Sequence, residues 1–140
     1  MKILFDASAI MVITKNHPEE AVAQLKDNHL LDLTIYELGN TIWKINRLLN
    51  NPDKRTALES MEQVYELTAL MKTHAAQDRQ THIAIMENAF QNNLTYYDSA
   101  YLTTAQREKY TLVTEDKQLQ KAANATNINA MDTDELLKTI

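Results

Sequence analysis

The sequence contains no cysteine, which excludes disulfide bridges, cysteine-ligated zinc, iron–sulfur clusters and thiol nucleophiles. Glycine occurs once, at Gly39, so a Walker loop and a glycine-rich dinucleotide fingerprint are both excluded. No apolar run approaches the ~18 residues that a membrane span needs, and Asp6 interrupts the first apolar run too early for a signal peptide. We therefore expect a cytoplasmic protein that has no nucleotide-binding loop.

The composition that remains is that of an ordinary globular domain. The chain has 140 residues, of which 44% are hydrophobic, and this is enough to bury one core. No linker, repeat or low-complexity stretch interrupts it. We expect one domain spanning residues 1–140.

Acidic residues outnumber basic residues by 19 to 14, and the resulting net charge of −5 argues against binding nucleic acid across the whole surface. Residues 38–58 depart from this balance, since they carry four basic residues against the single acid Asp53. The four basic residues are Lys44, Arg47, Lys54 and Arg55. Two interpretations remain open: solvated helix faces, or a phosphate-contacting rim beside an acidic pocket.

Short apolar and β-branched runs predict strands at residues 3–5, 30–35, 94–97, 110–114 and 127–131. Start signals and apolar spacings predict intervening helices that begin near residues 18, 36, 52, 78, 100, 118 and 134. For the third of these, Asn51 is the expected cap and Pro52 the first helical residue. Strands separated by helices pair in parallel, and a chain with one glycine has little use for tight hairpins. The predicted fold class is α/β: one open, mainly parallel, twisted sheet with helices on both faces.

Four acids follow the predicted strands at the edge where such sheets form their sites. They are Asp6, Glu37, Asp98 and Asp116. Each acid alone has a structural explanation, because Asp is a favoured helix cap and Glu in a first turn complements the helix dipole. Gathered together, however, two carboxylates about 4 Å apart would repel by roughly 4 kcal/mol at an effective dielectric near 20.

Such repulsion is relieved by proton uptake or by a bound cation. Omitting the four acids changes the net charge from −5 to −1. An all-oxygen cluster favours Mg²⁺ or Mn²⁺ over zinc, and these ions commonly serve phosphoryl chemistry. The pattern therefore predicts a metal site at the carboxyl edge of the sheet.

Four segments resemble the signature segments of PIN-domain ribonucleases, and most closely those of VapC-type toxins. They are residues 3–8 (ILFDAS), 36–40 (YELGN), 97–102 (YDSAYL) and 112–119 (LVTEDKQL). The resemblance implies a Rossmann-like sheet and an endoribonuclease that uses Mg²⁺ or Mn²⁺. It also implies that the four acids are metal ligands, and that they and Thr114 are the catalytic residues. Thr114, with Ser8 or Asn40, would line the pocket. The partners it implies are an RNA substrate, a cognate antitoxin and a second copy in a homodimer.

Two other functions compete with this hypothesis. One is a catalytically inactive PIN-like module that only binds a partner protein or RNA. The other is an aspartate-based phosphohydrolase, which normally carries a second Asp two residues after the first, where this chain has Ser8. The histidines lack metal-binding spacing and are expected at the surface or at caps, whereas Trp43 and the tyrosines are expected in the core. These tyrosines are Tyr36, Tyr65, Tyr97 and Tyr101.

Overall fold

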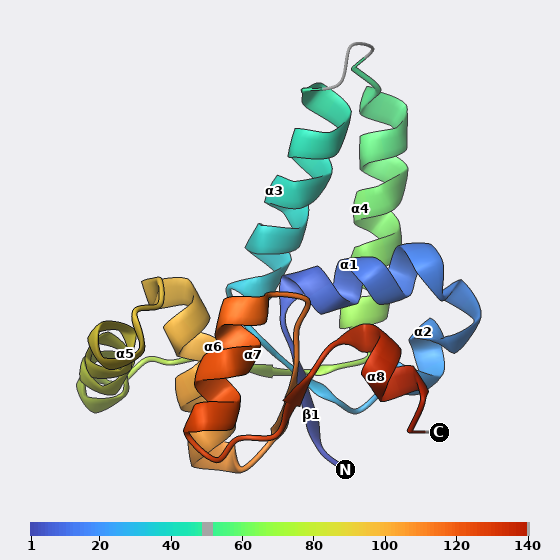
Figure 1. Cartoon of the computed structure of the whole chain (residues 1–140). Coiled ribbons are helices and arrows are strands. Elements are labelled where there is room, and N and C mark those ends of the chain that lie inside the picture. Colours follow the sequence, from blue (N-terminus) through green and yellow to red (C-terminus); the bar gives the residue numbers. More distant parts are fainter. Residues whose placement is uncertain (49–51, 140) are drawn as a thin grey trace.

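The computed structural model describes residues 1–48 and 52–139, which form five strands and eight helices (Figure 1). The strands are β1 (Ile3–Phe5), β2 (His29–Leu31), β3 (Lys72–His74), β4 (Thr111–Val113) and β5 (Ala130–Met131). The helices are α1 (Ala7–Asn16), α2 (Pro18–Leu25), α3 (Thr34–Arg47), α4 (Lys54–Thr68), α5 (Arg79–Asn92), α6 (Tyr96–Glu108), α7 (Lys117–Ala125) and α8 (Thr133–Leu137). The strands form one parallel sheet in the order β3-β2-β1-β4-β5, which confirms the predicted fold class.

Two hydrophobic cores lie on opposite faces of this sheet, as the alternation of side chains along β1 illustrates. Ile3 and Phe5 pack with α1–α4 and α8, whereas Leu4 packs with α5–α7. Because successive side chains of a strand point to opposite faces, both faces of β1 must be covered, and its burial is complete. The prediction of helices on both faces is confirmed.

Local signals explain most helix starts. Pro18 occupies the first turn of α2, and the Asp78 carboxylate caps α5 by accepting from the Thr81 backbone. The start of α4 differs from the prediction. Its cap is Asp53 and Pro52 precedes it, so Pro52 does not hold the first helical position. Asn51, which the pattern predicts as the cap, lies outside the described residues.

The structure differs from the sequence interpretation in four places. Helix α1 follows β1 directly and strand β3 is short and exposed, and neither was anticipated. The predicted strand at residues 94–97 does not form, because Thr95 caps α6 and the helix begins at Tyr96. The predicted strand at 30–35 ends early, since Thr34 already begins α3.

The expectation of buried aromatic side chains is also largely wrong. Tyr101 is buried, but the four others are exposed. These are Tyr36, Trp43, Tyr65 and Tyr97. His29 departs from its expected surface position as well, because it is buried between His74 and Tyr110. Among the described residues, none of the helices has both the length and the apolar character needed to cross a membrane.

Candidate active site

The two central strands bring Asp6 and Thr114 together. Strands β1 and β4 pair in register, with Phe5 opposite Val113, so the residues that follow them are neighbours at the carboxyl edge. The Asp6 backbone N–H donates to the Val113 carbonyl at 3.2 Å, and the Thr114 hydroxyl donates to Asp6 Oδ2. A direct bond therefore joins residues that lie far apart in the sequence.

Asp6 is the most deeply placed acid of the site, with a side chain only 6% exposed. Its Oδ1 caps α1 by accepting from the Ala9 backbone N–H at 3.0 Å, and it also accepts from the Ser8 hydroxyl at 2.7 Å. Burial raises the pKa of Asp6 to about 6, since these hydrogen bonds offset only part of the desolvation. Asp6 is thus a helix cap and also a carboxyl group that resists ionisation.

Glu37 lies in the first turn of α3 and is held by a relay of hydroxyl groups. The Tyr101 hydroxyl donates to Glu37 Oε1 at 2.6 Å, so the hydroxyl 2.7 Å away on Thr34 must donate to Tyr101 in turn. The Leu31 backbone N–H then donates to Thr34 at 3.0 Å. The relay runs from the end of β2 to the Glu37 carboxylate and fixes one of its two oxygens.

The four acids influence one another in a row. Burial raises the pKa of Glu37, and the charge of Asp98 raises it further. Burial likewise raises the pKa of Asp98, with an added contribution from Asp116, while the charge of Glu37 adds to the raised pKa of Asp6. Hydrogen bonds place the acids near one another: Thr114 bonds to both Asp6 and Asp116. Tyr101, on the same helix as Asp98, bonds to Glu37, so the structure brings all four predicted acids to one region.

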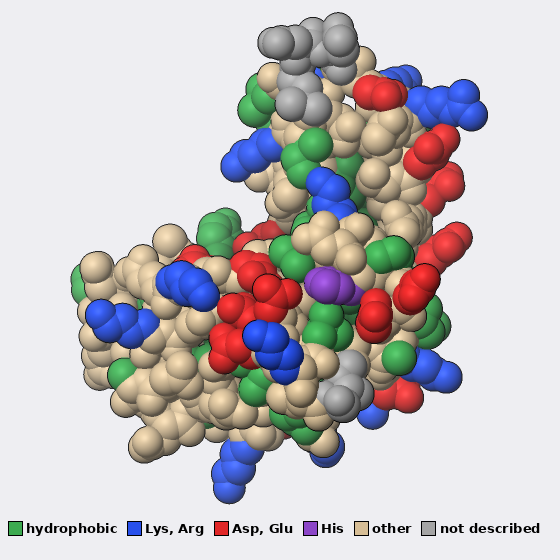
Figure 2. Space-filling model, turned by 45° about the vertical axis from the view of Figure 1, so that its right-hand side comes forward, with side chains coloured by type: hydrophobic (Ala, Val, Ile, Leu, Met, Phe, Trp, Pro, Cys, Tyr) green, Lys and Arg blue, Asp and Glu red, His purple; other side chains and the backbone are tan. Residues whose placement is uncertain are grey.

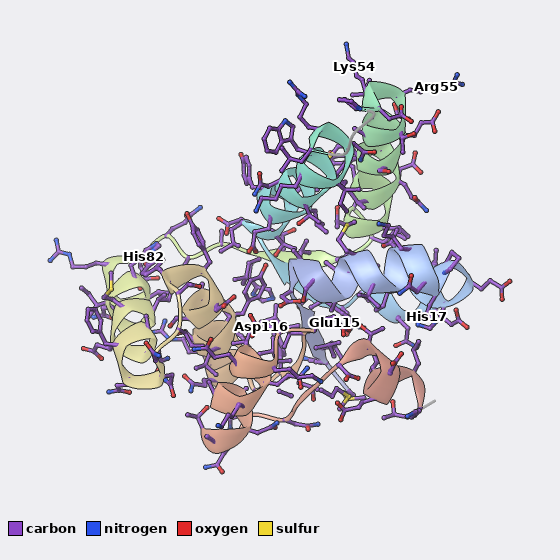
Figure 3. The ribbon with its side chains drawn as sticks, turned by 45° about the horizontal axis from the view of Figure 1, so that its top comes forward. His17, Lys54, Arg55, His82, Glu115 and Asp116 are labelled. Atoms are coloured by element: carbon purple, nitrogen blue, oxygen red, sulfur yellow. The ribbon has the colours of Figure 1, made fainter. Side chains whose placement is uncertain are left out.

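Asp116 and Thr114 complete this region. The Asp116 carboxylate caps α7 by accepting from the Gln118 and Leu119 backbones, and its own N–H donates to the Thr114 hydroxyl at 3.1 Å. Figure 3 shows Asp116 at the start of α7, beside the beginning of α1. In Figure 2 acidic side chains gather near the middle of the visible face.

Some predicted details change. Asp98 does not follow a strand but lies in the first turn of α6, three residues before Tyr101. Ser8 contacts Asp6 and also accepts from the Glu115 backbone N–H, whereas Asn40 is exposed further along α3. The sequence interpretation missed the contact that Tyr101 makes with this region, although its spacing from Asp98 places both on neighbouring positions of one helix face.

The donor set suits a hard divalent cation, because the four carboxylates and the hydroxyl groups bonded to them offer oxygen. Within residues 1–48 and 52–139, however, no three acidic or histidine side chains already converge as a metal cage. Hydrogen bonds account for the absence of such a cage among these residues, because carboxylate oxygens already accept from the hydroxyl groups of Ser8, Thr114 and Tyr101. The raised pKa values of Asp6, Glu37 and Asp98 mark a region where added positive charge would be stabilising.

Two of the four basic residues of the α3–α4 hairpin lie far from these acids. Figure 3 shows Lys54 and Arg55 at the far end of the hairpin, well separated from Asp116. Lys44 and Arg47 are exposed on α3. The interpretation as a phosphate-contacting rim is therefore wrong for Lys54 and Arg55.

Comparison with known proteins gives a consistent result. The family model described as "PIN domain" matches residues 3–125. A curated relative from Pyrobaculum aerophilum, named "Ribonuclease VapC3", is 32% identical over 129 residues, which cover 85% of this chain and 92% of the relative. The crystal structure of PAE2754 from the same organism has a TM-score of 0.81 at 26% identity, covering 99% of this chain and 96% of that chain. A toxin–antitoxin complex from Klebsiella pneumoniae shares the fold, with a TM-score of 0.63 at 13% identity over 85% of this chain and 90% of that chain.

Proposed function

This chain belongs to the PIN-domain family, and from that premise we propose that it is an endoribonuclease that hydrolyses RNA phosphodiester bonds with Mg²⁺ or Mn²⁺. The observation that carries the proposal is the row of mutually repelling carboxylates at the carboxyl edge of the sheet. Capping explains Asp6 and Asp116 singly, but gathering four carboxylates costs stability, whereas a phosphodiesterase needs such a row to hold cations against its substrate. The name of the curated relative, a ribonuclease, supports RNA as the substrate.

Each residue of the row would have a distinct role in metal binding and catalysis. Asp6 and Asp98 would hold the principal ion, and Glu37 and Asp116 would complete its shell directly or through water. The bound ion would supply the positive charge that offsets the phosphate and activates water. Thr114 would orient Asp6 through the bond it donates. Because Tyr101 occupies Oε1 of Glu37, a proton taken from the attacking water would reside on Oε2.

The decisive experiment compares three Asp→Asn variants in an RNA cleavage assay with Mg²⁺ or Mn²⁺. Asp6→Asn and Asp98→Asn should lower cleavage by at least about 100-fold with the circular dichroism spectrum retained. Asp53→Asn is the matched control, because Asp53 is also a helix cap and Asn caps nearly as well. Undiminished cleavage by both site variants refutes the assignment, and calorimetry without divalent-ion binding by the folded wild type favours an inactive binding module.

We further propose that the protein is the toxin of a VapBC-type pair, acts in the cytoplasm and is inhibited by a cognate antitoxin. The toxin–antitoxin complex that shares this fold supports such a partner. Expression of the chain alone should arrest growth, and Asp98→Asn should abolish the arrest. A short upstream reading frame that encodes a DNA-binding protein, and whose co-expression restores growth, is the expected antitoxin. Normal growth during expression of the wild-type chain contradicts the toxin role.

The proposed homodimer finds support on the outer face of α5. Three large apolar side chains are exposed there, namely Ile83, Met86 and Phe90, with exposed fractions of 55%, 47% and 84%. Their spacing places them on one stripe together with the exposed Arg79 and Glu87. In an antiparallel pairing of two α5 helices about a two-fold axis near Ile83, Arg79 lies opposite Glu87 of the second copy.

This arrangement predicts a charge-swap result. Arg79→Glu and Glu87→Arg should each weaken the dimer in sedimentation equilibrium, and the double variant should restore it because the charges are again complementary. Arg55→Glu on α4 serves as the control. A double variant that is weaker than either single variant contradicts this interface.

A further inference from the structure

A cavity of about 330 Å³ lies outside the row of acids, between α5, α6 and the ends of β2 and β3. Its walls are mainly apolar and include Leu31, Leu33, Ile85 and Ala100. Cavities of this size and character hold small ring systems, and a few polar groups at the wall orient the ligand. The chemistry of the wall therefore indicates what the cavity binds.

Two aromatic rings in the cavity wall form one flat surface. The His82 and Tyr96 rings differ in orientation by only 2°, and their centroids are 6.1 Å apart. They are joined edge to edge by a 2.5 Å hydrogen bond between His82 Nδ1 and the Tyr96 hydroxyl. Since face-to-face stacking would bring the centroids closer, the two rings lie side by side in nearly one plane.

A second hydrogen bond, made by His82, fixes the flat surface in place. His82 Nε2 lies 2.8 Å from the Ala76 carbonyl, which can only accept, so Nε2 donates and Nδ1 accepts from Tyr96. Ala76 lies in the segment between β3 and α5, and His82 is near the start of α5 (Figure 3). Three elements thus hold the two rings rigidly, which lowers the entropy cost of stacking a ligand on them.

The cavity is next to the row of acids. Leu33 lies in its wall, and Glu37 is one helical turn further along the same helix. Tyr97 also lies in the wall, and Asp98 is the next residue. A chain of nucleotides whose phosphate reaches the acids would therefore carry a neighbouring base to the mouth of the cavity.

We propose that this cavity binds one unstacked base of the RNA strand, which lies flat on the His82–Tyr96 surface. The inference rests on the proposed nuclease function and deepens it, because it requires a single-stranded substrate. Sequence-tolerant stacking on aromatic side chains is how many proteins hold single strands. Arg107, whose guanidinium donates to Thr81 at 2.6 Å, and Asp32 add a donor and an acceptor at the wall for the edge of the base.

The test uses 5′-AMP as the probe, with EDTA present, and follows the backbone amides by NMR. AMP should shift the amides of Ala76, Thr81 and Thr104, and His82→Ala should weaken its binding about ten-fold. Tyr96→Phe keeps both rings but removes their hydrogen bond, so an intermediate loss is expected. Tyr65→Phe is the control, since Tyr65 is exposed on α4 and does not line the cavity.

A second measurement distinguishes an RNA base from a free nucleotide. In the cleavage of single-stranded RNA, His82→Ala should raise KM about ten-fold and leave kcat unchanged. Loss of AMP binding with an unchanged KM overturns the RNA subsite and assigns the cavity to a free nucleotide. AMP shifts elsewhere, or wild-type AMP affinity in both variants, overturn the cavity assignment itself. Intact AMP binding in a protein that cleaves no RNA leaves the cavity assigned and refutes the nuclease function.

Discussion

The carboxyl edge of the sheet and the distal half of the α3–α4 hairpin use their polar residues in opposite ways. At the edge, Asp6, Thr114 and Tyr101 are buried, hydrogen-bonded and close to carboxylates. In the distal hairpin the charged side chains are exposed, and the hairpin projects beyond the rest of the molecule (Figure 1). The carboxyl edge thus loses stability by gathering partly buried carboxylates, whereas the distal hairpin carries exposed charges at almost no cost in stability.

The largest expected effect concerns Asp6. Its pKa is about 6 in the folded chain and 3.8 in the unfolded chain, so the native state binds the proton more tightly between these values. Stability of the metal-free protein therefore falls as the pH rises through this range, by about 3 kcal/mol. Asp6→Asn should remove that loss and raise the free energy of unfolding at pH 7 by a similar amount.

Urea unfolding in EDTA at pH 4 and pH 7 measures this effect. Asp53→Asn serves again as the control, because Asp53 is fully exposed and its pKa is lowered by the bonds it accepts from Thr56. It should not stabilise the chain at either pH. An Asp6→Asn variant with the same pH dependence as the wild type would remove the contrast between the two regions.

An intermediate effect is expected for Tyr101→Phe. The variant leaves Glu37 Oε1 and the Thr34 hydroxyl without their buried partner, which should cost about 1–3 kcal/mol of unfolding free energy. It should also raise the pKa of Glu37, because the bond from Tyr101 favours the charged form. Urea unfolding and an NMR titration of Glu37 measure both changes. Tyr65→Phe in the hairpin should change neither, and equal effects of the two variants would contradict the proposed relay.

The smallest effect is expected at the tip of the hairpin. The double charge reversal Lys54→Glu and Arg55→Glu should change the free energy of unfolding by less than about 0.5 kcal/mol. The bond from Arg55 to Glu59 is exposed, and such pairs contribute little. Cleavage of a short RNA should be unaffected, because these residues are remote from Asp116. A steep loss of affinity with a changed salt dependence would instead extend the RNA site to the hairpin.

Sequence patterns predict the parts of this molecule that have local causes. Strands β1 and β4 are short apolar runs, and the caps of α5 and α7 are the aspartates that the sequence indicates. The predicted row of acids depends on these elements, since two parallel strands bring their carboxyl ends together in any sheet of this class. Asp98 lies in the row although the strand predicted before it does not form. The first turn of α6, which Thr95 caps, holds Asp98 at the same edge of the sheet.

The remaining features depend on contacts that no local pattern encodes. Strand β3 is recognisable only by its pairing with β2, since its own residues are polar and exposed. Spacing shows that Ile83, Met86 and Phe90 share a helix face, but not that this face is turned away from the core. For Tyr101, sequence predicts burial correctly and is silent on the hydroxyl, whose partners come from α3.

The bond between Thr114 and Asp6 joins positions separated by 108 residues. Asp6 leaves the ribosome before its hydroxyl partner, in a helix cap that it can form from its own neighbours, and Thr114 emerges only after a further 108 residues have been synthesised. A nascent chain shorter than 114 residues therefore has the first acid without the strand that positions it. Termination of the growing chain before β4 consequently yields fragments in which the row of acids is incomplete, because Thr114 and Asp116 are missing.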